Sequence, residues 1–215
     1  MPSSLVGLKR TLVWDDFKGK VPSGDTAAAA TFSGFTVSVP TYESTDGGVR
    51  LKDEITVRIT FDPNQSWKQL AVAQLADSDP VKKDLLDHEQ GHYNISALIA
   101  RDLFIRLMTL KGTVYPDKAA GNRDYQDWQN IYGGRLTNVQ GAYDNDTLGG
   151  QANVFNPNTN VFTPPVQKSN QQIRWEGFIT TAFTKQRTPP VTAPDGVLYK
   201  VELIDVLLAA GVQFP

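Results

Sequence analysis

The feature that most constrains this chain is the pentapeptide His88-Glu89-Gln90-Gly91-His92, which stands inside the longest helix-like pattern of the sequence. On an α-helix, residues four positions apart lie on the same face, so the imidazoles of His88 and His92 can bind one metal ion. Glu89 lies beside that face and can act as a general base on a metal-bound water. These are the only two histidines in the 215 residues. The pattern therefore predicts a metal site rather than a chance pair.

The residues that flank this motif predict a helix over about residues 80–111. Asp77, Ser78 and Asp79 are candidate N-caps, Pro80 suits the first helical position and Gly112 can end the helix. Gly91 costs about 1 kcal/mol relative to alanine in a helix interior, so its presence inside the motif argues against an ordinary helix. Apolar residues recur at helical spacing and predict one buried stripe: Leu85, Ile95, Leu98, Ile99, Leu103 and Leu107.

Composition excludes several classes of function. The formal net charge is −2, which argues against a nucleic-acid or anionic-membrane partner. The chain has no cysteine, which excludes disulfides, thiolate metal ligands and a cysteine nucleophile. No stretch is long and apolar enough to predict insertion into a membrane. Residues 1–10 have no sustained apolar run, so we predict no signal peptide in this chain and leave its location open.

The order of strand-like and helix-like segments predicts a single α+β domain over residues 1–215. We expect mainly strands in 1–79, two long helices in 80–143 and a loop-rich C-terminal part in 144–215. Strands are predicted at 5–14, 31–44 and 49–61, and Asp46-Gly47-Gly48 predicts that the last two pair as an antiparallel hairpin. The second helix should run from about 119 to 142, with a possible kink at Gly133-Gly134. Residues 143–170 are predicted to form a long loop, whereas 171–183 and 198–208 are ordered segments of undecided type.

A catalytic zinc site needs three protein ligands, and composition restricts the third. With no other histidine and no cysteine, it must be a carboxylate or, as a weaker alternative, a tyrosine. Asp102 lies about 15 Å along the helix from His92 and cannot reach the same ion. We predict Asp144, because it stands where the second helix ends and can return to the first. Asp146 is its near rival, Glu176 is a further alternative, and the Asp/Asn cluster also fits a simple turn.

Five segments of the chain carry a family resemblance, and they are Leu12–Gly19, Ala28–Gly34, Ser66–Trp67, Leu85–Ile95 and Tyr143–Thr147. Their order resembles that of an uncharacterised bacterial family of predicted, usually secreted, zinc-dependent proteases. The resemblance covers roughly residues 12–151, and the segment around His88 is its most specific part. It implies a zincin-like fold, with an antiparallel or mixed sheet before the long active-site helix. It also implies His88 and His92 as zinc ligands and Glu89 as the base.

The chain departs from this family pattern in two respects. Family members often carry a His-Gly pair after the Tyr-Asp-x-x-Thr segment, whereas this chain has Leu148-Gly149-Gly150. If that histidine is the third ligand of the family, the site here is incomplete; if Asp144 is the ligand, nothing is lost. The resemblance suggests an exported protein, but no signal peptide is visible.

Together these observations predict a zinc metallopeptidase that acts on a peptide or protein substrate. Zinc held by His88, His92 and Asp144 would activate a water, and Glu89 would take its proton. Tyr143 is predicted to donate a hydrogen bond to the developing oxyanion. Tyr93 is an alternative donor, although core packing is the favoured interpretation for it. Two other functions stay open, a non-catalytic module stabilised by zinc and a zinc hydrolase of a non-peptide amide.

Overall fold

The structure is a computed structural model that describes residues 2–149, 155–156, 159, 161–162, 170–185 and 200–214. The main strands are β1 (Ser4–Val6), β2 (Ala29–Ala30), β3 (Ser33–Val37), β4 (Tyr42–Thr45), β5 (Gly48–Leu51), β6 (Thr56–Phe61), β7 (Trp67–Lys68) and β8 (Val114–Tyr115). The helices are α1 (Leu70–Gln74), α2 (Pro80–Thr109), α3 (Lys118–Thr147), α4 (Asn170–Thr184) and α5 (Leu203–Ala209). Two-residue strands β9 (Phe155–Asn156) and β10 (Val161–Phe162) pair with each other, and 3-10 turns lie at Trp14–Asp16 and Leu110–Gly112. The predicted α+β class is confirmed.

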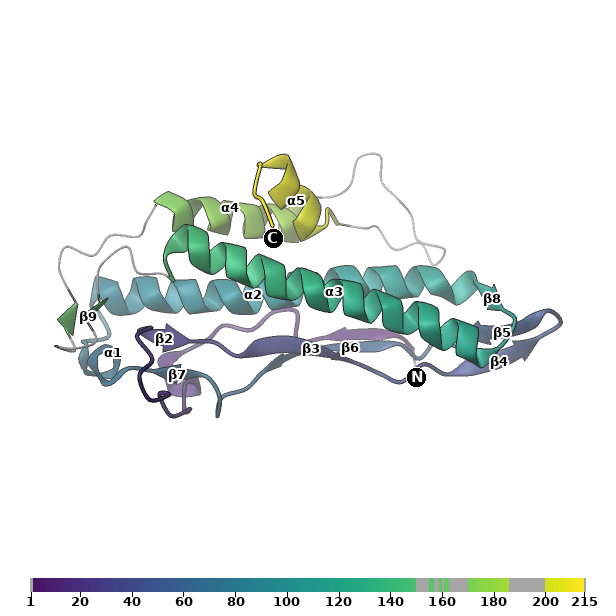
Figure 1. Ribbon diagram of the computed structural model, residues 1–215, viewed down its shortest axis with the longest axis horizontal. Coiled ribbons are helices and arrows are strands. Elements are labelled where there is room, and N and C mark those ends of the chain that lie inside the picture. The colour runs from purple at the N-terminus through teal and green to yellow at the C-terminus, as the bar shows by residue number, and fades with distance from the viewer. Residues whose placement is uncertain are drawn as a thin grey trace.

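The elements form layers that Figure 1 shows edge-on. The strands make the lower layer, α2 and α3 lie side by side above them, and α4 with α5 covers the helices from the other side. The central sheet has the order β1-β6-β3, in which β1 is parallel and β3 antiparallel to β6. A second sheet, β4-β5-β8, extends the first toward the far end of the molecule. Helix α2 is therefore enclosed between the central sheet and three other helices.

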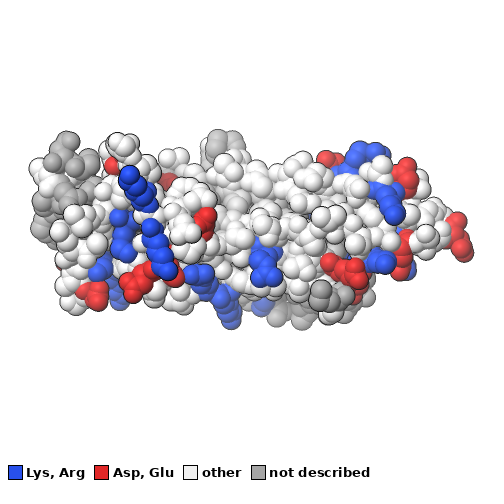
Figure 2. Space-filling view, turned by 90° about the horizontal axis from the view of Figure 1, so that it is seen from below, with Lys and Arg blue, Asp and Glu red and all other residues white. Residues whose placement is uncertain are grey.

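The predicted pairing of 31–44 with 49–61 is confirmed, but each long strand is divided in two. β3 pairs with β6, and β4 pairs with β5 through the turn at Asp46-Gly47. Pro40, which has no backbone N–H to donate, separates β3 from β4. Alternation holds within β6, where Val57 and Ile59 are buried and Arg58 is exposed. Figure 2 shows the face below the sheet, where Lys, Arg, Asp and Glu gather toward both ends and few lie between.

The strand predicted at 5–14 is mostly wrong, because within this segment only the residues up to Val6 pair in a sheet, as part of β1. Gly7 follows with a φ of 87°, a left-handed conformation that ends the strand. The chain then crosses to α2, where the Leu12 amide donates to the Gln90 side chain at 2.8 Å. Gln90 also donates to the Arg10 carbonyl at 3.0 Å. The glutamine of the motif thus fastens this segment to the helix.

Helix α2 agrees with the prediction at its start and differs in its burial. The Asp79 carboxylate accepts a hydrogen bond from the Val81 amide at 2.9 Å, and Pro80 is the first helical residue. The six consecutive residues from Ile95 to Ala100 are all 0% exposed. A single buried stripe was expected, but neighbouring elements cover the middle of α2 on every side.

Helix α3 runs without a break from Lys118 to Thr147, so Gly133-Gly134 does not interrupt it. It also runs five residues beyond the predicted end at 142 and stops at Leu148, which has a φ of 54°. Its buried face against α2 carries Tyr125, Tyr132, Val139 and Tyr143, spaced by seven, seven and four positions as a helical face requires. Packing of this face outweighs the low helix propensity of the two glycines.

The C-terminal part was expected to be rich in loops, but its described residues include α4 and α5. In α4 the buried positions are Gln172, Trp175, Ile179 and Ala182, which form one stripe. Of the loop predicted at 143–170, residues up to Thr147 are helical, and most of the remainder lies outside the described residues. Among the described residues, no helix combines the length and the apolar character needed to cross a bilayer.

Candidate metal centre

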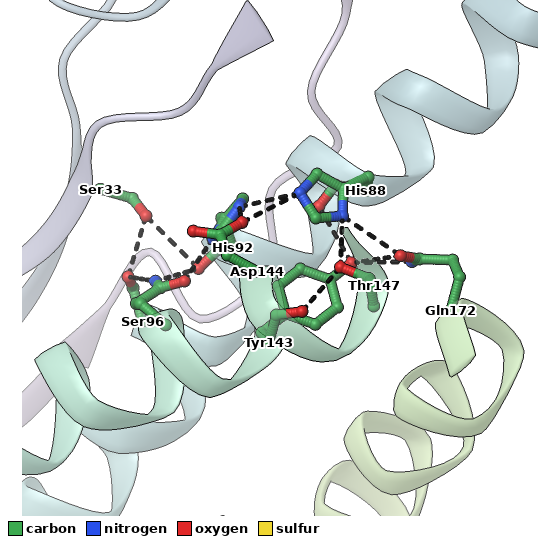
Figure 3. A network of polar contacts seen from close by, with 9 residues as sticks. Ser33, His88, His92, Ser96, Tyr143, Asp144, Thr147 and Gln172 are labelled. Carbon is green, nitrogen blue, oxygen red and sulfur yellow. Dashed lines mark hydrogen bonds and ion pairs between the residues drawn. The ribbon is translucent and has the colours of Figure 1, made fainter. Parts of the chain in front are cut away.

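The three residues predicted as ligands come together between α2 and α3. His88 and His92 lie one turn apart on α2, and their Nε2 atoms are 3.1 Å from each other. Asp144, in the last turn of α3, places Oδ1 3.0 Å from His92 Nε2 and 3.3 Å from His88 Nε2. Figure 3 shows the two rings and the carboxylate converging on one point. Two helices that are adjacent in space but separated in sequence therefore build one cluster.

The dimensions of this cluster fit a tetrahedral metal ion. Zinc binds histidine nitrogen and carboxylate oxygen at about 2.0–2.2 Å, so the ligand atoms of a tetrahedral site lie about 3.3 Å apart. The three separations in the structure are 3.1, 3.0 and 3.3 Å. His88 and His92 expose only 2% and 12% of their side chains, whereas Asp144 exposes 50%. The site is thus closed on the histidine side and open beside the carboxylate, where a fourth position could take water or substrate.

Gln140 of α3 determines which nitrogen of His92 faces the cluster. Its Nε2 donates to the His92 carbonyl at 2.9 Å and to Ser96 Oγ at 3.2 Å. A backbone carbonyl only accepts, so the amide is oriented with Oε1 toward His92 Nδ1, with which it is in hydrogen-bond contact. Nδ1 must then carry the proton. The lone pair of Nε2 is left for a metal ion.

Gln172 of α4 orients the His88 ring in the same way. Its Nε2 donates to Glu176 Oε1 at 3.2 Å and to the Tyr143 hydroxyl at 2.7 Å, so Oε1 is turned toward His88 Nδ1 at 3.2 Å. Thr147 Oγ1 lies 3.4 Å from the same nitrogen. His88 is therefore also oriented with Nδ1 as donor and Nε2 as ligand.

Tyr143 lies beneath both histidines rather than in the open side of the site. Its ring stacks on His88 at a centroid distance of 4.7 Å and meets His92 edge-on at 5.0 Å. The residue is 0% exposed, and its hydroxyl contacts the His88 carbonyl and Gln172. Burial raises the pKa of this phenol well above its usual value. The oxyanion-donor role stays a prediction, and the geometry favours a positioning role.

Without a metal, the histidines and Asp144 shift one another's pKa values. Burial opposes protonation of His92, but the hydrogen bond and charge of Asp144 outweigh it and raise the pKa of His92 to about 9. Burial also opposes ionisation of Asp144, yet hydrogen bonds from His88 and His92 hold its pKa well below the usual range. The carboxylate is therefore anionic at neutral pH, as a metal ligand must be.

A cleft of about 860 Å³ opens at the cluster. His88, Glu89, His92 and Asp144 line it on the helix side, and the segment from Ala29 to Phe35 lines it on the strand side. Glu89 is 2% exposed, and its Oε2 is one of three buried side-chain atoms without a hydrogen-bond partner among the described residues. A buried carboxylate oxygen without a partner is costly in free energy, so a role in binding or catalysis is a reason for it.

The other carboxylates considered as third ligands face elsewhere. Asp146 accepts a hydrogen bond from the Trp175 indole at 3.0 Å, and Glu176 bonds Gln172. Asp102 is buried beside Arg101 and accepts from the Leu203 amide at 3.0 Å. Asp144 is therefore the carboxylate that joins the two histidines.

Of three further residues in this region, only Tyr93 had a role predicted from the sequence. Tyr93 donates to the Gly7 carbonyl at 2.5 Å within the core, in keeping with the packing interpretation. Gln140 and Gln172 were missed altogether. For Gln140 a signal existed, because it lies one turn before Asp144 on the same helix. For Gln172 there was none, since its segment had no predicted type.

No protein-family model, no curated protein and no solved structure matches this chain. The resemblance described from the sequence therefore stays a prediction, and the chemistry of the site must be argued from its own geometry.

Proposed function

We propose that this chain is a zinc-dependent metallopeptidase with His88, His92 and Asp144 as ligands and Glu89 as general base. The observation that carries the proposal is the buried Glu89 carboxylate. One of its oxygens has no hydrogen-bond partner in the described part of the chain, and Glu89 lines the same cleft as three atoms at tetrahedral spacing. A purely structural zinc site is normally closed by a fourth protein ligand. The half-exposed Asp144 leaves this cluster open, which favours a catalyst.

Each residue then has a defined task in peptide hydrolysis. Zinc, when bound, lowers the pKa of a water molecule and polarises the scissile carbonyl. Glu89 would accept a proton from that water as the water oxygen bonds to the scissile carbonyl carbon, and it would deliver the proton to the leaving amine nitrogen as the C–N bond breaks. Gln140 and Gln172 keep Nδ1 of each histidine protonated, so that Nε2 can bind the ion. Tyr143 is buried beneath the cleft and shields the back of the two imidazole rings from water.

The strand side of the cleft supports an extended peptide as substrate. β3 is the edge strand of its sheet, and Ser33, Gly34 and Phe35 line the cleft. Backbone groups of an edge strand can pair with an added peptide strand. Three features support a zincin-like arrangement. The sheet is mixed, the motif helix lies beside its edge, and a second long helix places a carboxylate next to the histidines.

The proposal is tested with Glu89→Gln in the full chain. Loss of a general base lowers turnover by about 100-fold or more, so we expect hydrolysis of denatured casein to fall at least that far. Zinc content, measured by mass spectrometry, should stay at one ion per chain. Glu43→Gln, on the exposed β4 strand, serves as control and should be fully active. Equal activity of the two variants, or casein hydrolysis that survives complete removal of zinc, would contradict the proposal.

A further inference from the structure

Helix α4 contributes directly to the metal centre, although it follows α3 by more than twenty residues. Gln172 is 3% exposed and lies between His88 and Tyr143. Figure 3 shows it reaching His88 from α4, on the side of the ring opposite Asp144. Through this contact a side chain of α4 hydrogen-bonds one of the predicted metal ligands.

The hydrogen bonds around Gln172 close a directed ring. His88 Nδ1–H donates to Gln172 Oε1 at 3.2 Å, and Gln172 Nε2 donates to the Tyr143 hydroxyl at 2.7 Å. The Tyr143 hydroxyl can then donate to the His88 carbonyl at 3.2 Å. The Tyr143 hydroxyl also lies 3.0 Å from Gln172 Oε1, to which it can donate in place of the carbonyl. Reversing the proton of His88 would leave two acceptors facing each other in a buried place, which is costly.

Two further contacts, both made by Trp175, dock this part of α4. Trp175, at 0% exposure, donates to Asp146 at 3.0 Å and meets the Tyr143 ring edge-on at 5.2 Å. Tyr143 in turn stacks on His88. A continuous line of contacts therefore joins the indole of α4 to the imidazole of α2, and α3 supplies the ring between them.

We propose that α4 is a functional part of the metal centre: Gln172 is a positioning residue for His88, and metal binding is coupled to the docking of α4. This inference rests on the proposed metal site, but not on peptidase activity. Because coupling between two equilibria is reciprocal, metal binding must stabilise the docked helix to the same extent that the docked helix strengthens metal binding.

The chain offers a matched pair of glutamines for the test, since Gln171 is exposed and its neighbour Gln172 is buried. Gln172→Met keeps the length of the side chain and removes its hydrogen bonds, and Gln171→Met is the control. Loss of the partner of a ligating histidine lowers metal affinity by about 10- to 100-fold, so we expect that loss in Gln172→Met alone. Zinc affinity is measured by competition with a chromophoric chelator.

Two readouts separate positioning from general instability. With saturating Co²⁺, the visible absorption reports the ligand geometry, and we expect a changed spectrum for Gln172→Met and an unchanged one for Gln171→Met. In the wild type, zinc should slow hydrogen exchange of the α4 amides, and this slowing should be reduced in Gln172→Met.

Three combinations of results distinguish the α4 coupling, the metal site and the peptidase activity. Wild-type affinity and spectrum in Gln172→Met, with α4 exchange indifferent to zinc, would overturn the coupling and leave the metal site standing. Zinc binding with the expected coupling but no peptidase activity would support this inference and contradict the proposed function. A wild-type chain that does not bind zinc would overturn both.

Discussion

The hydroxyl of Tyr143 occupies the space that a side chain at position 91 would need. A methyl group added to Gly91 would lie 2.2 Å from the Tyr143 hydroxyl oxygen and 2.6 Å from its Cζ. The glycine inside the histidine motif is thus explained by a close approach of α3 to α2. This approach also brings Asp144, the next residue after Tyr143, within reach of both histidines.

Gly91→Ala should therefore destabilise the protein and weaken the metal centre. The added methyl group must displace Tyr143, and overpacking of this kind costs about 1–3 kcal/mol of folding free energy. We expect the free energy of unfolding, measured with urea, to fall by that amount, and zinc affinity to fall with it. Gly134→Ala is the control, because its methyl group would meet no atom within 4 Å. It should raise stability by about 0.5–1 kcal/mol; similar losses in both would refute the packing explanation.

Asp144→Asn should weaken zinc binding far more than Asp146→Asn. The first change removes the anionic ligand, for which we expect about a 100-fold loss of affinity. The second leaves an amide oxygen that can still accept from Trp175, so affinity should stay within about threefold of wild type. Competition with a chromophoric chelator measures both, and circular dichroism checks that the fold is kept. The reverse order of effects would place the ligand two residues further on.

Thr31 is expected to contact the substrate. Its Oγ1 is buried without a hydrogen-bond partner among the residues that the structure describes, and the residue lines the cleft. Loss of one hydrogen bond to the substrate costs about 1 kcal/mol, so Thr31→Val should lower kcat/KM on casein-derived peptides by roughly fivefold to tenfold. Zinc affinity should not change. Within the described ranges, Thr45 Oγ1 is likewise buried without a partner, but Thr45 lies on β4 outside the cleft. Thr45→Val should therefore leave kcat/KM unchanged. Equal effects of the two changes would exclude a substrate contact.

Because of Asp102, we expect the free energy of unfolding to depend on pH, and this effect is separate from the metal site. Burial raises its pKa from 3.8 to about 7, against the opposing effect of Arg101. Between these two values the folded protein holds a proton that the unfolded chain releases, so the free energy of unfolding should fall as pH rises toward 7 and then level off.

Urea unfolding of metal-free protein from pH 5 to 8 measures this effect, with Asp102→Asn as reference. The difference between wild type and variant isolates Asp102 from other titrating groups. It should decline up to about pH 7 and stay flat above. A difference that rises with pH over this range would show that Arg101 dominates over burial.

Local features of the sequence were enough to predict the start of α2 and the geometry of its motif. The Asp79 cap and Pro80 act within the first turn, and the spacing of His88 and His92 places them on one face whatever surrounds the helix. Composition restricted the third ligand, because a chain with no further histidine or cysteine has to use another side chain. These inferences depend on contacts close in sequence or on residue counts.

The long strand predictions failed where tertiary contacts compete with propensity. Residues 7–14 leave the sheet because the segment bonds to Gln90 on α2. Residues 143–147 continue α3 because Tyr143 is buried against α2 and α4. Neither partner is close in sequence, so no local pattern signals the change.

The sequence by itself determined that the two histidines share one helix face with Glu89 beside it, and it restricted the predicted third ligand to a carboxylate or, as a weaker alternative, a tyrosine. Only the tertiary structure shows that Asp144 lies beside both histidines. Residues two apart on a helix point about 200° from each other, so Asp144 faces the histidines while Asp146 faces Trp175. Gln172 could be found only in the folded chain, because its role depends on where α4 docks. Docking is determined by the buried faces of three helices together, and no single segment contains that information.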